Sequence, residues 1–379
     1  MKVAIIGGGA SGVVAALRIK MNNPEIGVTI YEKNNKLLKK VSTTGNGRCN
    51  LSNTDITPNK YQNPNVISEM IDAGYKDSVM DFFGELGLFT IVEEGRIYPK
   101  SNQAQTVVEL LTKELFYKKV NVILNAEISR IKQVNGKFVI LDEEYDKVLI
   151  CVGTNASVNN YNCEILNNLG LKCIPFKPAL VGFKVKEDIS ILFGVRASAT
   201  VSLNGKTSKG EVMFKEDGVS GICVMDLSVY RTNNNVLSFD FLDDYSFEML
   251  KMIVNRKLKN DPYVHLHNLL FGSVNNKLLG MFNKGYPNAK VATLDSMVLD
   301  SYLKQFKDYK LTIVDTYPIN NAHVAKGGIS LDELNLFEVK SNPNIYILGE
   351  ATNQVGICGG FNLWYAFTSG LIVGDKICK

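Results

Sequence analysis

The sequence is poor in the residue types that build disulfide scaffolds, metal centres and redox dithiols. Its 379 residues include seven cysteines, three histidines and one tryptophan. The cysteines are odd in number, widely spread and without a Cys-x-x-Cys pair, which argues against a disulfide framework, structural zinc or dithiol chemistry. We expect His265 and His267 to lie on opposite faces if their segment is extended, and we predict no metal site.

Long hydrophobic runs and a strong excess of one charge are also missing. No apolar run approaches the length that crosses a bilayer, and the first apolar strand begins at residue 2, which leaves no room for a signal peptide. We therefore expect a cytoplasmic protein without a membrane partner. The net charge is only +4 and basic residues are dispersed among acidic ones, so nucleic acid is not the expected partner.

The first 32 residues carry a dinucleotide-binding pattern. A short apolar strand at residues 3–6 runs into the glycine-rich turn 7–12, an apolar helix follows, and Glu32 ends the next apolar run. Strand, glycine turn, helix, strand and terminal acid in this order are typical of a βαβ unit that binds an adenine dinucleotide.

The glycines and the acid of that unit each have a predicted structural role. Gly7 permits the sharp turn, Gly9 leaves space for a diphosphate, and Gly12 lets the helix pack closely on the strand. The amides at the helix start favour an anion there. Glu32 lies 20 positions after Gly12, the spacing of a carboxylate that accepts ribose hydroxyls, and an acid here argues against a 2′-phosphate.

Three further apolar runs, at residues 120–124, 148–153 and 345–349, indicate strands buried on both faces of a parallel sheet. The last returns the chain to the nucleotide domain near its C-terminus. Between about 175 and 240, short alternating segments and the Asn204-Gly205 turn indicate an antiparallel sheet or barrel-like domain. From Ser246, a plausible helix cap, to about Gln305 the period is helical.

We accordingly predict three domains. Residues 1–175 and 320–379 form the nucleotide-binding domain, residues 176–243 an inserted β-rich domain, and residues 244–319 an inserted helical lobe. With 45% hydrophobic residues the chain has enough apolar material for cores of this size.

Two loops of the first domain are too rich in glycine and amide side chains for simple connectors. In residues 43–53, Gly45 and Gly47 allow the backbone to pass close to a flat ligand, and Arg48 can balance phosphate or flavin charge, although a polar surface turn explains them too. In residues 349–362, a Gly-Gly pair opens an apolar helix, which suits a flavin ring or serves packing alone.

At these residues the chain resembles the HI0933-like, or aminoacetone-oxidase-like, family of bacterial FAD-dependent oxidoreductases, which are related to the flavoproteins with two dinucleotide-binding domains. The resemblance covers nearly the full length, and its most specific element is the Gly-x-Gly-Arg-Cys-Asn run at residues 45–50. Supporting runs lie at residues 95–99, 178–181, 210–214, 218–221, 327–329 and 349–362. The chain departs from the family pattern at residues 151–154, 215–216 and 222, and at Asn353, where aspartate is common.

The resemblance implies an α/β fold in which both chain ends form a Rossmann-like FAD-binding domain of the GR2 type, with a β-rich barrel-like insertion and a small helical domain. It also implies which residues bind FAD. On the ADP side these are Gly7, Gly9, Ala10, Ser11, Gly12, Glu32 and Lys33. On the flavin side they are Lys40, Gly47, Arg48, Cys49, Asn50, Gly153, Gly349, Glu350, Gly360, Phe361 and Asn362.

We expect an enzyme that acts on a small molecule, with flavin N5 as the hydride carrier. Catalytic residues are unknown, because hydride transfer needs no dedicated acid–base pair. The candidates are Cys358, His323 and Tyr98, each of which also has a purely structural interpretation as a buried thiol, a hydrogen-bonded ring or a loop support.

Electron donor and acceptor stay open at this point. A second complete glycine fingerprint is absent, so NADH or NADPH would dock transiently, and a reductase driven by them competes with an oxidase of a small amine. A flavoprotein acting on RNA is the alternative from another class, with Lys251, Lys257, Lys259 and Lys277 of the helical lobe as contacts or merely as a solvated face. A protein that binds FAD without turnover is the last alternative.

Overall fold

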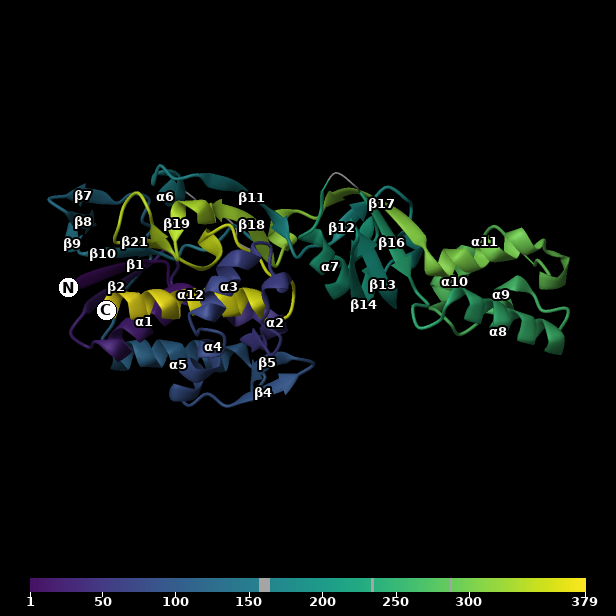
Figure 1. The fold of residues 1–379 in the computed structure, drawn as a ribbon, viewed down its shortest axis with the longest axis horizontal. Coiled ribbons are helices and arrows are strands. Elements are labelled where there is room, and N and C mark those ends of the chain that lie inside the picture. The colour runs from purple at the N-terminus through teal and green to yellow at the C-terminus, as the bar shows by residue number, and fades with distance from the viewer. Residues whose placement is uncertain (157–163, 233–234, 287) are drawn as a thin grey trace. The chain divides into compact units, whose positions relative to one another are not determined.

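The computed structural model describes residues 1–156, 164–232, 235–286 and 288–379, and these form two compact units (Figure 1). The first unit consists of Met1–Lys177 and Val324–Lys379, and the second of Pro178–His323. Both chain ends therefore belong to the first unit, as the predicted C-terminal strand requires. The three-domain division with its exact boundaries stays a prediction.

In the described part of the chain, a seven-stranded sheet of order β19-β20-β21-β10-β1-β2-β6 forms the centre of the first unit. Its strands are β1 Lys2–Ile6, β2 Gly27–Glu32, β6 Asn121–Leu124, β10 Lys147–Ile150, β19 Leu334–Asn335, β20 Glu338–Val339 and β21 Ile345–Ile347. The five strands from β21 to β6 are parallel, and β19 and β20 are antiparallel additions. The strand order reverses at β1, the position beside which doubly wound sheets bind ligands.

The three apolar runs predicted as parallel strands correspond to β6, β10 and β21, but β6 is not buried on both faces. It lies at the edge of the sheet, where Ile123 is 36% and Leu124 39% exposed. That expectation was wrong because a short apolar run does not distinguish a central strand from an edge strand.

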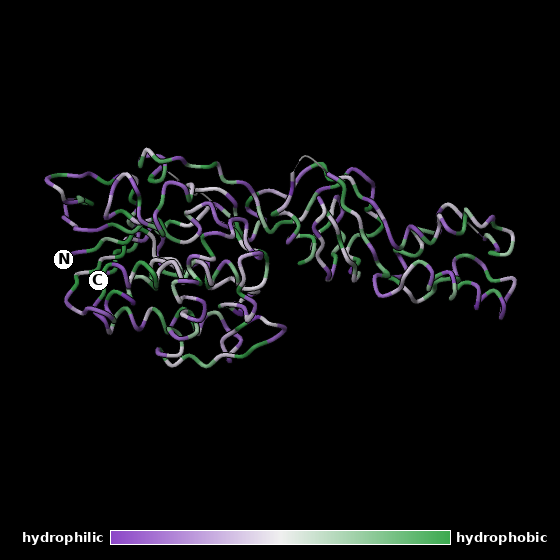
Figure 2. Tube along the Cα trace, in the orientation of Figure 1, coloured by the Kyte–Doolittle hydropathy of each residue, from purple (hydrophilic) through white to green (hydrophobic). Residues whose placement is uncertain are grey.

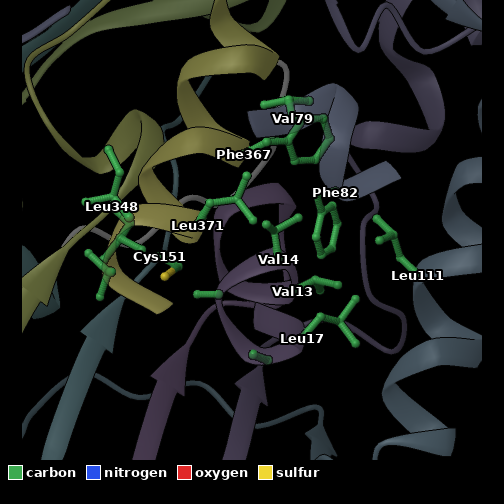
Figure 3. Packing of buried hydrophobic residues seen from close by; sticks show 14 of the residues in the cluster. Val13, Val14, Leu17, Val79, Phe82, Leu111, Cys151, Leu348, Phe367 and Leu371 are labelled. Carbon is green, nitrogen blue, oxygen red and sulfur yellow. The ribbon is translucent and has the colours of Figure 1, made fainter. Parts of the chain in front are cut away.

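Five helices of eight or more residues are described in the first unit. They are α1 Ala10–Asn22, α3 Pro64–Asp72, α4 Ser78–Glu85, α5 Ala104–Tyr117 and α12 Phe361–Cys378. Val13, Val14 and Leu17 of α1 pack against Phe82 of α4 and Leu371 of α12 in one buried cluster (Figure 3). Along the chain, hydrophobic segments alternate with hydrophilic ones (Figure 2), and the strands and these helices supply the buried hydrophobic residues of the cluster.

The first and last helices of the chain touch through small residues. A Cβ at Gly370 would lie 2.5 Å from the Ser11 carbonyl oxygen, and one at Gly374 would lie 2.7 Å from Arg18 Cβ. Glycine is therefore needed at both positions for α12 to lie this close to α1, and the contact holds the two chain ends together.

A polar network closes the far end of that helix pair. Asp375 accepts hydrogen bonds from Arg18 Nε at 2.5 Å, Asn22 Nδ2 at 2.7 Å and the Tyr75 hydroxyl at 2.8 Å. Burial alone raises the pKa of Asp375, but the hydrogen bonds from these three groups outweigh burial and hold the pKa below its ordinary value.

Shorter elements complete the first unit. Strands β3 Ser52–Asn53, β5 Arg96–Pro99 and β4 Thr90–Glu93 form a small antiparallel sheet beside the short turn α2 Thr44–Gly47. Strands β7 Lys132–Val134, β8 Lys137–Ile140 and β9 Glu143–Tyr145 form a second one, α6 is Glu164–Asn167, and β11 Cys173–Ala179 pairs with β18 Val324–Ile329.

The second unit contains a closed barrel of order β12-β15-β14-β13-β16-β17 in its described residues, which confirms the barrel-like prediction. The strands are β12 Phe183–Val185, β13 Arg196–Leu203, β14 Lys206–Phe214, β15 Gly218–Ser220, β16 Val236–Asp240 and β17 Tyr309–Thr316. The predicted Asn204-Gly205 turn joins β13 to β14, with positive φ at both residues. Strand β17 comes from a stretch that the sequence analysis counts with the helical lobe.

The helices described in this unit share one core with the barrel. They are α7 Ile222–Ser228, α8 Phe247–Asn260, α9 Leu266–Leu269, α10 Asn276–Asn283 and α11 Ser296–Lys307. The ring of Phe282 lies 4.7 Å from Phe306 and 6.2 Å from Phe241 between centroids, so helices and barrel bury the same aromatic cluster. The predicted cap is confirmed, since Ser246 Oγ accepts from Met249 N at 3.1 Å.

One expectation about the second unit was wrong. The rings of His265 and His267 do not lie on opposite faces, because their centroids are 5.6 Å apart. The expectation assumed an extended segment, but His265 is the N-cap of α9 and His267 lies inside that helix. Even on an extended segment, residues two apart point to the same side, since side chains alternate with a period of two.

Candidate functional site

The glycines of the turn between β1 and α1 differ in the space that the protein leaves for a side chain. A Cβ at Gly7 would lie 2.3 Å from the Cys151 carbonyl oxygen, and one at Gly12 would lie 2.1 Å from the Gly7 carbonyl oxygen. A Cβ at Gly9 would meet no heavy atom within 4 Å. Packing therefore requires glycine at 7 and 12, whereas the protein itself leaves free space beside Gly9, where the sequence analysis places a diphosphate.

The start of α1 leaves backbone donors beside that space. Gly9 is the N-cap, no side chain caps the helix, and its first turn has no acidic residue. Val13 N donates to the Gly9 carbonyl at 3.0 Å, so the amides of Ala10, Ser11 and Gly12 precede the first helical hydrogen bond. Such amides, together with the positive end of the helix dipole, favour an anion.

Glu32 has a structural task that its spacing did not reveal. One carboxylate oxygen accepts from Gly8 N at 2.8 Å, and the other accepts from Asn34 N at 2.8 Å and Asn34 Nδ2 at 2.6 Å. The side chain thus ties the end of β2 to the glycine turn. An ionised carboxylate has about four acceptor sites, so Glu32 retains capacity for a ribose hydroxyl. Lys33, the next residue, is half-buried.

Lys40 and Glu350 form an ion pair between the two ends of the chain. Lys40 Nζ lies 2.7 Å from Glu350 Oε2, and the side chains are 32% and 17% exposed. Lys40 follows β2, whereas Glu350 lies in the short turn Gly349–Ala351 after β21. Both were predicted on the flavin side separately, and the structure brings them together. The turn also touches α1, since a Cβ at Gly349 would lie 2.9 Å from Ser11 Oγ.

Four residues of the loop after Lys40 have a left-handed backbone. The φ angles are 58° at Gly45, 54° at Asn46, 81° at Gly47 and 59° at Cys49. Glycine and asparagine adopt this conformation more readily than other residues. Residues 45–47 are exposed, and a Cβ at Gly47 would meet no heavy atom within 4 Å, so the loop offers bare backbone to its surroundings.

Arg48 is engaged by neighbouring side chains. Its Nη2 donates to Glu93 at 2.5 Å and to Asn102 Oδ1 at 2.7 Å, while its Cζ lies 4.0 Å from the centroid of the Tyr98 ring. Glu93 therefore balances the guanidinium charge, and the contacts fasten the left-handed loop to β4 and β5. The sequence did not indicate these partners, and charge compensation toward a ligand stays a prediction.

Cys49 and Asn50 lie buried behind the loop. Burial raises the pKa of the Cys49 thiol to about 12, despite an opposing hydrogen bond with Thr44, so the thiol is protonated at neutral pH. Asn50 is 9% exposed, and in the described residues its Oδ1 is buried without a hydrogen-bond partner. A Cβ at Gly360 would lie 2.8 Å from that oxygen. The Asn50 oxygen can therefore accept a hydrogen bond from a bound ligand.

The C-terminal loop ends in a second glycine-started helix. Gly360, the N-cap of α12, has φ of 98°, and a Cβ there would lie 2.3 Å from the Ser52 carbonyl oxygen. Phe361 is buried, edge-on to Tyr61 at 5.8 Å. Asn362 accepts from Gly356 N and donates to the Gly356 carbonyl, both at 2.9 Å, so its side chain closes the preceding loop.

The catalytic candidates do not lie in one unit. Tyr98 is 6% exposed beneath Arg48, and Cys358 is half-buried in the loop before α12, both in the first unit. His323 is the last residue of the second unit, where its backbone N–H donates to the Leu180 carbonyl at 3.2 Å. Gly153, with φ of 67°, follows β10 in the first unit.

These residues fit a bound FAD. The open space beside Gly9 and the first-turn amides of α1 suit the diphosphate, and the remaining acceptor capacity of Glu32 suits the ribose. The unpartnered Asn50 oxygen, the Lys40–Glu350 pair and Gly360 suit the polar edge of a flavin. Every one of them belongs to the first unit.

Comparisons with known proteins show the family of the chain. Residues 1–376 match the family model described as HI0933-like protein Rossmann domain. The chain is 30% identical to the 3-dehydro-bile acid delta(4,6)-reductase of Clostridium scindens, over 98% of each protein. It is 23% identical to the ribosomal RNA dihydrouridine synthase of Haemophilus influenzae, over 99% of this chain and 98% of that protein. A flavocytochrome c3 fumarate reductase structure matches at 12% identity and a TM-score of 0.48, over all of this chain and 78% of the other.

The described helices were also compared with the length and hydropathy of a membrane-spanning helix. None is both long enough and apolar enough to cross a bilayer.

Proposed function

The chain belongs to the HI0933-like family of FAD-dependent oxidoreductases, and we propose that it reduces a carbon–carbon double bond conjugated to a ketone in a small apolar molecule, with NADH or NADPH as electron donor. One observation carries the substrate class: the 30% identity, over 98% of both proteins, to a reductase named for a 3-dehydro-bile acid with delta(4,6) bonds. A relative that matches end to end makes the same reaction type the simplest proposal.

The first unit supplies the binding groups for this reaction. Bound FAD supplies a ring that takes up a hydride and passes it on. The first-turn amides of α1 hold the diphosphate, and Glu32 holds the ribose while it fixes the glycine turn. Lys40 and Glu350, as a pair at the junction of the chain ends, orient the flavin end of the cofactor.

The reduction also needs a proton donor, and two buried cysteines can be excluded from that role. Burial raises the pKa of Cys49 and of Cys151 to about 12, so neither thiol gives up a proton at neutral pH. Cys358 and Tyr98 stay the candidate proton donors of the first unit, and His323 that of the second.

We propose that NADH or NADPH binds only transiently. The sequence has one complete glycine fingerprint, and the residues assigned to FAD already use it. NADH or NADPH would therefore reduce the flavin, leave as the oxidised nucleotide, and free the ring for the substrate.

Anaerobic stopped-flow mixing of the FAD-loaded protein tests the proposal. NADH or NADPH should bleach the flavin absorbance, and a 3-oxo-Δ4-steroid added next should restore it without oxygen. The corresponding saturated 3-oxo-steroid is the matched control and should leave the flavin reduced. Bleaching by aminoacetone but by neither nucleotide, with recovery only in oxygen, would establish an amine oxidase instead.

A further inference from the structure

The positive charge of the chain is concentrated in one segment. Residues 246–307, here called the helical lobe, contain nine Lys and Arg residues and four Asp and Glu residues, a net charge of +5. The whole chain carries +4, so all other residues together carry −1. The dispersion of basic residues expected from composition therefore does not extend to the helical lobe.

Part of this charge has no acidic partner. Lys251 pairs with Asp300 at 2.6 Å, and Lys307 pairs with Asp240 at 2.7 Å. In the described residues, six exposed basic side chains of the lobe form no ion pair within 4.0 Å: Arg256, Lys259, Lys277, Lys284, Lys290 and Lys304. Surface cations left in this way attract polyanions.

A row of rings lies next to these cations. From Tyr263 to His267, rings alternate with buried aliphatic residues: Val264 is 8% and Leu266 0% exposed. Tyr263 and His267 are exposed, whereas His265 is half-buried, with its Nδ1 3.1 Å from the Asn288 carbonyl oxygen. Tyr263 is 72% exposed, and the rings of His265 and His267 are 5.6 Å apart, tilted by 38°. We call Tyr263, His265 and His267 the ring row.

Backbone pairing fixes the ring row in place. Leu266 N donates to the Ala289 carbonyl at 2.8 Å, and Val291 N donates to the Val264 carbonyl at 2.9 Å. Lys290, between these two partners, has its Nζ 5.6 Å from the centroid of the Tyr263 ring. The second half of α8, which carries Arg256 and Lys259, directly precedes the segment. Rings and cations thus share one preorganised surface.

We infer that this surface binds single-stranded RNA, with bases stacked on the ring row and phosphates near Lys290 and the end of α8. Stacking rings beside a cationic track are the features that recognise single strands without sequence preference. The inference concerns the second unit alone and does not rest on the proposed reaction.

An anionic membrane is the less fitting occupant. An interfacial helix carries its apolar and cationic residues on opposite faces along its whole length. In α8 the exposed apolar residues Met249 and Met252 lie in the first half, whereas the unpaired cations Arg256 and Lys259 lie in the second.

Fluorescence anisotropy with a labelled oligouridylate of about a dozen nucleotides, a length in the range of single-strand sites, tests the inference on the full-length protein. Tyr263→Ala should weaken RNA binding about tenfold, within the range of one lost base stack. Inorganic polyphosphate, used as an unlabelled competitor without bases, should bind both proteins equally. Tyr263→Phe keeps the stacking ring and should bind RNA like the unsubstituted chain.

A second experiment reverses the charge of one lysine beside the ring row. Lys290→Glu should weaken both RNA and polyphosphate several-fold, because a phosphate contact is lost for each. Lys206→Glu is the matched control, since Lys206 Nζ lies 5.5 Å from the Tyr230 ring on the barrel, and it should change neither. Equal losses in Lys206→Glu and Lys290→Glu, no binding of RNA at low salt, or binding of phosphatidylglycerol vesicles but not RNA would each overturn the inference.

Discussion

Helices α8, α10 and α11 of the second unit begin differently from α1 and α12 of the first unit. In the second unit, α8, α10 and α11 start at Ser246, Asn275 and Asp295, whose side chains accept hydrogen bonds from amides of the same helix. In the first unit, α1 and α12 start at Gly9 and Gly360, which have no side chain to do this. The capped helices satisfy their own amides and stabilise the fold, whereas the glycine-started helices keep amides accessible to a ligand.

The glycines of the first unit sharpen the same contrast. Neighbouring backbone atoms leave no room for a side chain at Gly7 and Gly12. At Gly9 the protein leaves room for a Cβ, and yet the residue is glycine. A position that costs backbone entropy without serving packing indicates a requirement from a ligand. If the open helix start serves FAD and the capped ones serve only the fold, substitutions in the two classes should have different effects.

The largest expected effect is on Gly9. Gly9→Val should lower FAD affinity by more than about 100-fold, because the side chain takes the space of the diphosphate. The unfolding midpoint of the FAD-free protein should stay nearly the same, since φ of −87° and ψ of −164° suit valine and a Cβ at this position would meet no heavy atom within 4 Å. FAD titration by fluorescence quenching and thermal melting give the two readouts.

Gly12→Val is the control for that experiment. Its Cβ would lie 2.1 Å from the Gly7 carbonyl, so the FAD-free protein itself should lose stability. If Gly9→Val retains FAD at the original affinity, the open helix start is not the diphosphate site.

Glu32 should give the next largest effect. Glu32→Ala should weaken FAD binding about 10- to 100-fold, because a charge-assisted hydrogen bond is worth about 1.5–3 kcal/mol and the tether to Gly8 N is lost with it. Glu32→Gln keeps one acceptor oxygen and should lose less. Isothermal titration calorimetry of both variants with FAD measures the affinities. An alanine variant that binds FAD as tightly as the original protein would count against the ribose assignment.

The ion pair network at the end of α12 should affect stability and its pH dependence. Asp375→Asn should lower the unfolding free energy at neutral pH by about 1–3 kcal/mol, the cost of leaving buried donors poorly satisfied. The pKa of Asp375 is below its ordinary value in the folded chain. Its stabilisation is therefore complete above the unfolded carboxyl pKa of about 3.9 and is lost as pH falls through the folded value.

Urea unfolding near neutral pH and in acid measures this effect. The original protein should lose more stability on acidification than Asp375→Asn, which has no carboxylate to protonate at this position. Parallel losses in the two proteins would mean that the network does not depend on the charge of Asp375.

The capped helices should give the smallest effect. Ser246→Ala should cost about 1 kcal/mol of stability, because the amide of Met249 loses its acceptor. Ser246→Asp should restore the cap. FAD affinity should be unchanged in both, and a substantial loss of affinity in the alanine variant would erase the distinction between the two classes of helix start.

Local patterns explain which features the sequence revealed. Strand period, glycine turn and terminal acid lie within the first 32 residues, and the structure confirms the βαβ unit and the returning strand β21. The positions of Gly7 and Gly12 follow from sterics of neighbouring backbone, which the motif encodes directly.

Long-range pairs explain what it did not reveal. Lys40 meets Glu350 across 310 positions, and Arg48 meets Glu93 across 45, and neither pairing leaves a local signal. The error at His265 and His267 had another origin, since the alternation of an extended segment was applied with the wrong parity.

A crystal structure of the protein grown with excess FAD tests the central claim most directly. If the open start of α1 holds the diphosphate, the density should show the diphosphate against the first-turn amides of α1, beside Gly9, and the adenosine ribose at Glu32. A crevice that is empty or filled by side chains at saturating FAD, or FAD bound elsewhere, would contradict it.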